Sequence, residues 1–93
     1  MKNEQIEIYS DASNMAVMRH PGRNYPGVLV QGDTLHSIVS ELQVVLAERQ
    51  KLSDDAAGEL EGVYERLSEM LTHYIAVLEK HGMDLPFNRR VGG

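Results

Sequence analysis

Hydrophobic and polar residues alternate near the start of the 93-residue chain, in the pattern of half-buried strands. Over residues 5–9, Ile6 and Ile8 point to one side, and the residues between them point to the other. A second alternating segment covers residues 15–19, and the β-branched run 28–30 is typical of a buried strand. These segments predict a short three-stranded antiparallel sheet.

Beyond residue 33 the apolar spacing lengthens to three or four residues, which indicates two amphipathic helices. One apolar stripe runs over residues 35–52 and another over residues 60–78. The second stripe is close to a heptad seam with a broad flank, as expected for a helix that packs against more than one neighbour. It comprises Leu60, Val63, Leu67, Met70, Tyr74 and Val77, with Tyr64, Leu71 and Leu78 beside them.

Residues that favour helix ends mark the limits of both helices. Asp33 or Thr34 is expected to cap the first helix, and Ser53 the second. Gly82 suits the left-handed position that ends a helix, with Met83 as its hydrophobic contact. The interpretation is an α+β fold in which an N-terminal antiparallel sheet precedes a C-terminal antiparallel helical hairpin.

The whole chain is expected to be one domain that associates with copies of itself. It comprises a β-meander with a Pro/Gly loop (1–32), the helical hairpin (33–82) and a tail (83–93), whose apolar residues should dock on the body or on a partner subunit. So short a chain has a thin core, and without cysteine no disulfide can reinforce it. The helical stripes exceed what one small sheet can cover. We therefore expect a homo-oligomer, such as a dimeric four-helix bundle or a larger ring.

The net charge of −5 argues against nonspecific binding to DNA or to an anionic membrane, because such surfaces call for a basic face. The acidic residues between Ser53 and Glu69 are interpreted as a solvated helix face. No apolar run approaches the length of a membrane span, and the N-terminus lacks a signal-peptide core. A cytoplasmic location is the expectation.

Catalytic and metal-binding patterns are missing from the sequence. The four histidines form no HxxxH or HxH pair, and the serines lack a nucleophile-elbow motif. No phosphate-binding or dinucleotide fingerprint occurs. We therefore expect no metal, no cofactor and no enzymatic activity; if the protein is an enzyme, His20, His36 and Asp33 are the residues to test.

The segment Arg19–Thr34 carries the strongest indication of a binding site. Two Pro-Gly pairs, expected to form type II turns, bracket the Arg23-Asn24 dipeptide. Guanidinium groups suit phosphate or carboxylate, glycines let backbone amides approach a ligand, and a helix N-terminus follows. This segment predicts an anion site. The candidate ligand-binding residues are Arg19, His20, Arg23, Asn24, Tyr25, Gln31, Asp33 and Thr34.

Two points leave the assignment open. A helix-capping Asp33 would already occupy the place of an anion, unless it accepts hydrogen bonds from a ribose hydroxyl. Arg19 could instead pair with Glu7 across the hairpin, which would make the loop a rigid connector. Arg89 and Arg90 of the tail could add positive charge to the site.

The run RHPGRNYPGVLVQGDTL (19–35) resembles the signature of a family of small, functionally uncharacterised bacterial and phage proteins. The order of strands and helices is similar to that of phage sponge proteins, and this resemblance implies sequestration of nucleotide signals used in anti-phage defence. The expected function is thus a non-enzymatic homo-oligomer that captures a small phosphorylated, nucleotide-like ligand. The alternative is a protein-interaction module (immunity, inhibitor or adaptor protein) that uses its acidic helix face or the loop tip.

Overall fold

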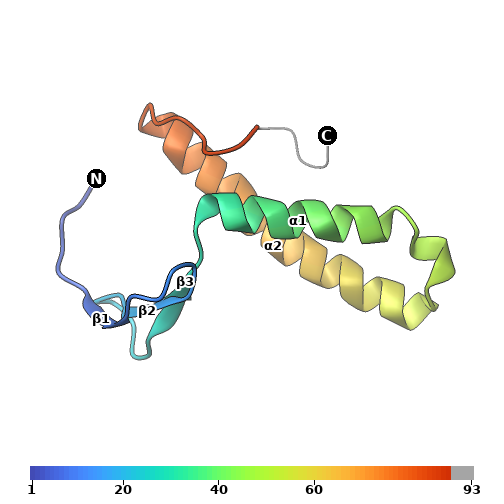
Figure 1. Ribbon diagram of the computed structural model, residues 1–93, viewed down its shortest axis with the longest axis horizontal. Coiled ribbons are helices and arrows are strands. Elements are labelled where there is room, and N and C mark those ends of the chain that lie inside the picture. The colour runs from blue at the N-terminus through green and yellow to red at the C-terminus, as the bar shows by residue number, and fades with distance from the viewer. Residues whose placement is uncertain (89–93) are drawn as a thin grey trace. The chain divides into compact units, whose positions relative to one another are not determined.

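The computed structural model describes residues 1–88, and the chain divides into two compact units. The first unit comprises residues 1–31 and the second begins at Gly32. A three-stranded antiparallel sheet is followed by two helices, so the predicted α+β fold is confirmed (Figure 1). Arg89 and Arg90, which the sequence offered as additional charge for the site, lie outside the described residues.

The first unit is an antiparallel sheet with the strand order β1-β2-β3. Its strands are β1 (Glu7–Ser10), β2 (Ala16–Arg19) and β3 (Gly27–Leu29), each within two residues of its predicted limits. Cross-strand neighbours share a face of the sheet, so the pairs Ile8↔Met18 and Ala16↔Leu29 lie on one side. The pairs Glu7↔Arg19 and Val17↔Val28 lie on the other.

The predicted burial of the third strand is wrong. All three residues of β3 are exposed, and Val28 retains 63% of its accessible surface. None of residues 1–31 is buried. A β-branched run indicates extended backbone but does not specify what covers it, and a single three-stranded layer supplies no second layer within its own unit.

The second unit is a helical hairpin made of α1 (Gly32–Leu46), a 3₁₀ turn (Arg49–Lys51) and α2 (Asp54–Lys80). Figure 1 shows α1 and α2 side by side and antiparallel, joined through the 3₁₀ turn. Arg49, the first residue of that turn, forms an ion pair with Glu61 of α2. Within residues 1–88, no helix combines the length and the apolarity needed to cross a bilayer.

The predicted helix ends agree with the structure at both ends of α2 but not at the start of α1. Ser53 caps α2 by accepting a 3.1 Å hydrogen bond from the amide of Ala56. Gly82 ends α2 with φ of 66°, and the amide of Met83 donates to the carbonyl of Leu78 over 2.9 Å, as in a Schellman motif. The predicted cap at Asp33 or Thr34 is wrong, because α1 already begins at Gly32.

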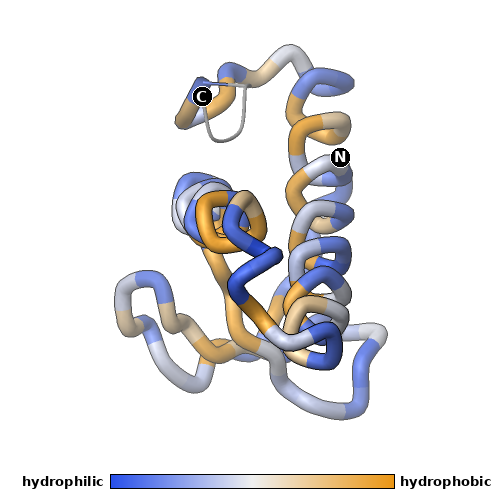
Figure 2. The backbone as a smooth tube through the Cα atoms, turned by 90° about the vertical axis from the view of Figure 1, so that its right-hand side faces the viewer, coloured by the Kyte–Doolittle hydropathy of each residue, from blue (hydrophilic) through white to orange (hydrophobic). Residues whose placement is uncertain are grey.

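The core of the helical unit is formed by Leu35, Val39 and Leu71. The line of α2 that faces this core passes through Ala57, Tyr64, Leu71 and Leu78, each seven residues from the next. The sequence placed three of these positions on the flank of the stripe. Hydrophobic residues recur along the whole of α2 (Figure 2). The core-facing line differs from the predicted one because these residues cover a wider arc of the helix than α1 buries, so Val63, Met70 and Val77 stay exposed.

The tail folds back onto the helices through Phe87, as expected from its apolar character. The Phe87 ring stacks on His36, with ring centroids 4.2 Å apart and 14° between the planes. Its centroid lies 6.3 Å from that of Tyr74. Tyr74 in turn lies against Gly32, so the start of α1, the later part of α2 and the tail converge at one point.

Candidate functional site

The loop between β2 and β3 is held in place by Arg19. Its Nε atom donates to Oε1 of Glu7 across the β1–β2 pair, and the Tyr9 hydroxyl donates to the same oxygen over 3.1 Å. Its Nη1 atom donates to the backbone carbonyl of Arg23 over 2.9 Å. The predicted pair between Arg19 and Glu7 is therefore formed. The Arg19 guanidinium also connects the β1–β2 hairpin to the loop tip.

These hydrogen bonds also set the charge state of the hairpin. The Arg19 guanidinium, followed by the Tyr9 hydroxyl, holds the pKa of the Glu7 carboxyl below its ordinary value of 4.5. The same carboxylate raises the pKa of Arg19. Both groups are therefore charged at neutral pH, and the charge of Arg19 is directed toward Glu7 rather than toward a ligand.

The first Pro-Gly pair forms a hydrogen-bonded turn. The amide of Arg23 donates to the carbonyl of His20 over 2.9 Å, and the amide of Gly22 donates to Nδ1 of the same histidine over 3.0 Å. The predicted type II geometry is wrong, since that turn needs a positive φ at Gly22. Among residues 1–88, Gly82 is the only glycine with positive φ.

The second predicted type II turn is not formed either. It requires a positive φ at Gly27, which instead opens β3 and pairs with Met18 of β2. Extended backbone at this glycine satisfies the strand pairing, which outweighs the local preference of a Pro-Gly pair for a turn. The loop therefore has one hydrogen-bonded turn, at the end nearer β2.

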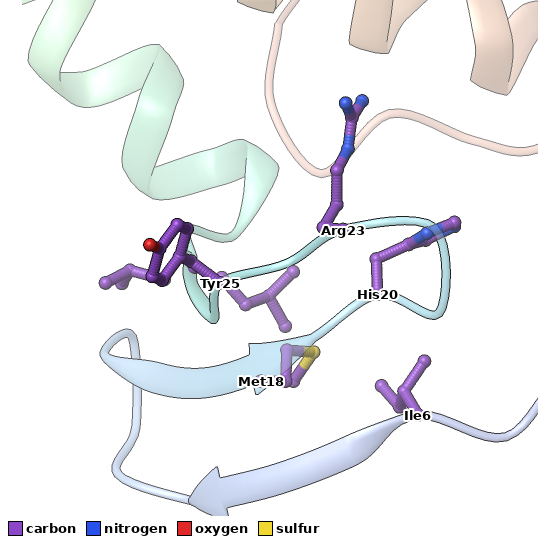
Figure 3. A pocket seen from close by; sticks show the side chains of 8 residues that line it. Ile6, Met18, His20, Arg23 and Tyr25 are labelled. Carbon is purple, nitrogen blue, oxygen red and sulfur yellow. The ribbon is translucent and has the colours of Figure 1, made fainter.

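A cavity of about 290 Å³ lies between this loop and the strands. Figure 3 shows Arg23 extending from the loop away from Ile6 and Met18, with His20 and Tyr25 on either side of it along the loop. The apolar part of the lining comes from Ile6, Met18, Val28 and Leu29, with Gly27. The cavity thus combines an apolar sheet surface with a cationic and aromatic loop.

Three of the eight predicted ligand-binding residues line this cavity, namely His20, Arg23 and Tyr25. Arg19 follows Met18 in β2, so its side chain leaves the opposite face of the sheet. Asn24 is exposed at the loop bend.

The remaining three predicted residues lie at or beyond the end of the sheet unit. Gln31 is its last residue, whereas Asp33 and Thr34 belong to the helical unit. The Asp33 carboxylate accepts a 2.9 Å hydrogen bond from the amide of Thr34. It therefore already uses one of the first-turn amides that an anion would need.

The apolar lining residues were not predicted as part of a site. For Ile6 and Met18 the signal in the sequence was the strand alternation, which places Ile6 on the same side as Ile8 and therefore as Met18. The sequence did not indicate that the β2–β3 loop lies over that face of the sheet. Within residues 1–88, no group of three or more His, Cys, Asp or Glu side chains is placed to bind a metal ion.

Comparison with known proteins places the chain in a family through nearly its entire length. A family of unknown function, DUF6959, matches residues 1–87. The chain belongs to this family. The DUF6959 match extends through both the sheet unit and the helical unit, well beyond the loop that suggested a family signature. Neither the curated proteins nor the solved structures give a significant match.

Proposed function

We propose that this protein is a non-enzymatic binding module whose sheet unit captures a small ligand with a flat, weakly polar body and an anionic group. A nucleotide has this character. The observation that carries the proposal is the 290 Å³ cavity, in which an apolar sheet surface is bordered by Arg23, His20 and Tyr25.

The volume of the cavity suits a small molecule. Protein sites for small molecules commonly occupy roughly 300–1,000 Å³, so this cavity lies at the small end of the range. Met18 and Ile6 offer an apolar surface to a ring, and Tyr25 offers an aromatic ring for stacking. A single base or a comparable ring system matches this lining.

Arg23 supplies the recognition of charge. Its amide is bonded to the carbonyl of His20 and its carbonyl to Arg19, so the backbone from which its side chain extends is fixed at both ends. Within the described part of the chain, its guanidinium forms no ion pair. A guanidinium fork held in this way can bind a phosphate or carboxylate through two hydrogen bonds.

Isothermal titration calorimetry with mono-, di- and cyclic nucleotides and with inorganic phosphate tests the proposal. One nucleotide should bind, and Arg23→Ala should weaken it roughly tenfold to a hundredfold, because a charged hydrogen bond contributes about 1.5–3 kcal/mol. Arg66→Ala, which removes an exposed arginine from α2, is the matched control and should leave the affinity unchanged. A flat response to the whole panel would overturn the proposal.

The more specific form of this proposal is a phage sponge that removes a nucleotide signal of anti-phage defence. It is supported by the order of strands and helices noted above. Preference for a cyclic nucleotide over the corresponding linear nucleotide in the same titrations would support it. Equal affinity for the cyclic and the linear nucleotide would still support a general nucleotide-binding function but would exclude the sponge.

A protein-interaction module is the second candidate. The observation that favours it is β3, an edge strand with exposed apolar residues beside the loop tip. Such an edge can pair with an extended peptide, because its outer amides and carbonyls have no strand partner in the sheet. Val28→Pro removes a backbone amide from β3. Loss of a co-purifying protein in this variant, with nucleotide binding absent in the wild type, would favour this alternative.

A further inference from the structure

The outer side of α2 carries a stripe of exposed apolar residues that the helical hairpin does not bury. Val63, Met70 and Val77 retain 38%, 56% and 37% of their accessible surface. They are spaced by seven residues, so they follow one line along the helix. The partly buried Leu67 and Tyr74 lie between this line and the core.

The stripe is symmetric about Met70. Val63 lies seven residues before it and Val77 seven residues after it. A helix that packs antiparallel against a second copy, with Met70 at the twofold axis, therefore places valine against valine on both sides of the central methionine pair. A surface whose two halves match each other in this way suits a second copy of the same chain.

Charges at the two ends of the stripe favour the same partner and the same direction. Glu59 lies four residues before Val63, and Lys80 lies three residues after Val77. Both charges therefore lie on the same face of α2 as the stripe, one at each end of it. Neither residue forms an ion pair within residues 1–88. Antiparallel packing sets Glu59 near Lys80 of the partner subunit at both ends, whereas parallel packing opposes like charges.

We propose that α2 forms the interface of an antiparallel homodimer through Val63, Met70 and Val77, with Glu59–Lys80 pairs at each end. The two hairpins together make a four-helix bundle, in which the apolar arc that α1 leaves uncovered is buried. This interface is independent of the proposed ligand, so it can be tested on the protein without any small molecule.

The first test is the mass of the protein in solution by sedimentation equilibrium or light scattering. The wild type should have twice the chain mass of 10.4 kDa. Met70→Glu should return the mass to that of a single chain, because it places two carboxylates together at the twofold axis. Thr72→Glu, two residues further along and therefore on the opposite side of α2, should leave the dimer intact.

Circular dichroism separates loss of the dimer from loss of the fold. Methionine and glutamate have similar helix propensities, and Met70 is exposed, so the helical signal of Met70→Glu should persist. If that variant unfolds, the charge variants decide the question instead. Glu59→Lys and Lys80→Glu should each weaken the dimer roughly twofold to tenfold, and their combination should restore it. Failure of the combination to restore the dimer would contradict the proposed pairing.

Disulfide trapping tests the direction of the helices, since the chain contains no cysteine. Copies with Val63→Cys are mixed with copies with Val77→Cys under mild oxidation. The antiparallel interface predicts a cross-link between the two kinds of copy in preference to cross-links within either kind. A monomeric wild type, a dimer that tolerates Met70→Glu while remaining folded, or preferential cross-linking between like copies would each overturn the inference.

Discussion

Gly32 stands where α1 begins, and the Tyr74 ring leaves no room for a side chain there. A Cβ atom added to this glycine would lie 2.1 Å from Cζ of Tyr74 and 2.3 Å from its Cε1. The ring itself has limited freedom to move, because it is half-buried and stacks near the Phe87 ring. Gly32→Ala should therefore force α1 and α2 apart or displace the ring.

The expected magnitude follows from two opposed effects. Overpacking a well-packed contact costs about 1–3 kcal/mol. Alanine gains up to about 1 kcal/mol over glycine inside a helix, and less at its first residue. Gly32→Ala should thus lower the free energy of unfolding by about 1–2 kcal/mol, which corresponds to a decrease in Tm of roughly 5–15 °C for a unit of this size.

Urea unfolding followed by circular dichroism at one protein concentration provides the assay. Gly62→Ala is the matched control, since a Cβ at Gly62 of α2 meets nothing within 4 Å. That variant should gain about 0.5–1 kcal/mol. The opposite signs of the two glycine-to-alanine changes separate the steric effect from helix propensity.

A double-mutant cycle with Tyr74→Ala identifies the residue responsible. Once the ring is removed, Gly32→Ala should become neutral or mildly stabilising. The reasoning is refuted if Gly32→Ala is as favourable as Gly62→Ala in the wild type. It is equally refuted if the penalty persists in the absence of the Tyr74 ring.

Three further predictions concern the two ends of α2 and the β1–β2 hairpin. Ser53→Ala removes the hydrogen bond to the Ala56 amide and should lower the free energy of unfolding by about 1 kcal/mol in the same urea assay, and an unchanged midpoint would contradict the capping role. Gly82→Ala should lower the free energy of unfolding by about 1–2 kcal/mol, because φ is 66° at this residue. An unchanged free energy of unfolding in that variant would argue against the left-handed conformation at Gly82. The pKa of the Glu7 carboxyl is lowered by Arg19, so the pair should stabilise the hairpin above about pH 4.5 and be lost as the pH falls through the lowered pKa. In an NMR titration, Arg19→Gln should move that pKa upward toward 4.5, and an unmoved pKa would exclude the guanidinium as its main cause.

Local features of the fold could be predicted from the sequence because neighbouring residues determine them. Alternation in the strands, three- and four-residue spacing in the helices, Ser53 as a cap and Gly82 as a stop all act over one or two turns of backbone. For the same reason the Glu7–Arg19 pair could be foreseen once the hairpin was assumed. In the candidate site, the loop residues His20, Arg23 and Tyr25 could be identified from composition alone.

The errors arose where the outcome depended on residues distant in the sequence. The β-branched run at β3 fixed its extended backbone but not its exposure. Gly27 adopted strand geometry because Met18 was available to pair with it, against the local preference for a turn. The apolar half of the cavity became part of the site only when the loop came to lie over the sheet face.

By itself, then, the sequence determined which segments are strands and helices, where α2 starts and stops, and which loop carries the positive charge. Only the tertiary structure decided which line of α2 faces the core and which stripe stays exposed. It also brought Gly32, His36, Tyr74 and Phe87 together at one point. The physical reason is one of range: backbone conformation responds to nearby residues, whereas burial and close contact are set by whichever distant surface packs against them.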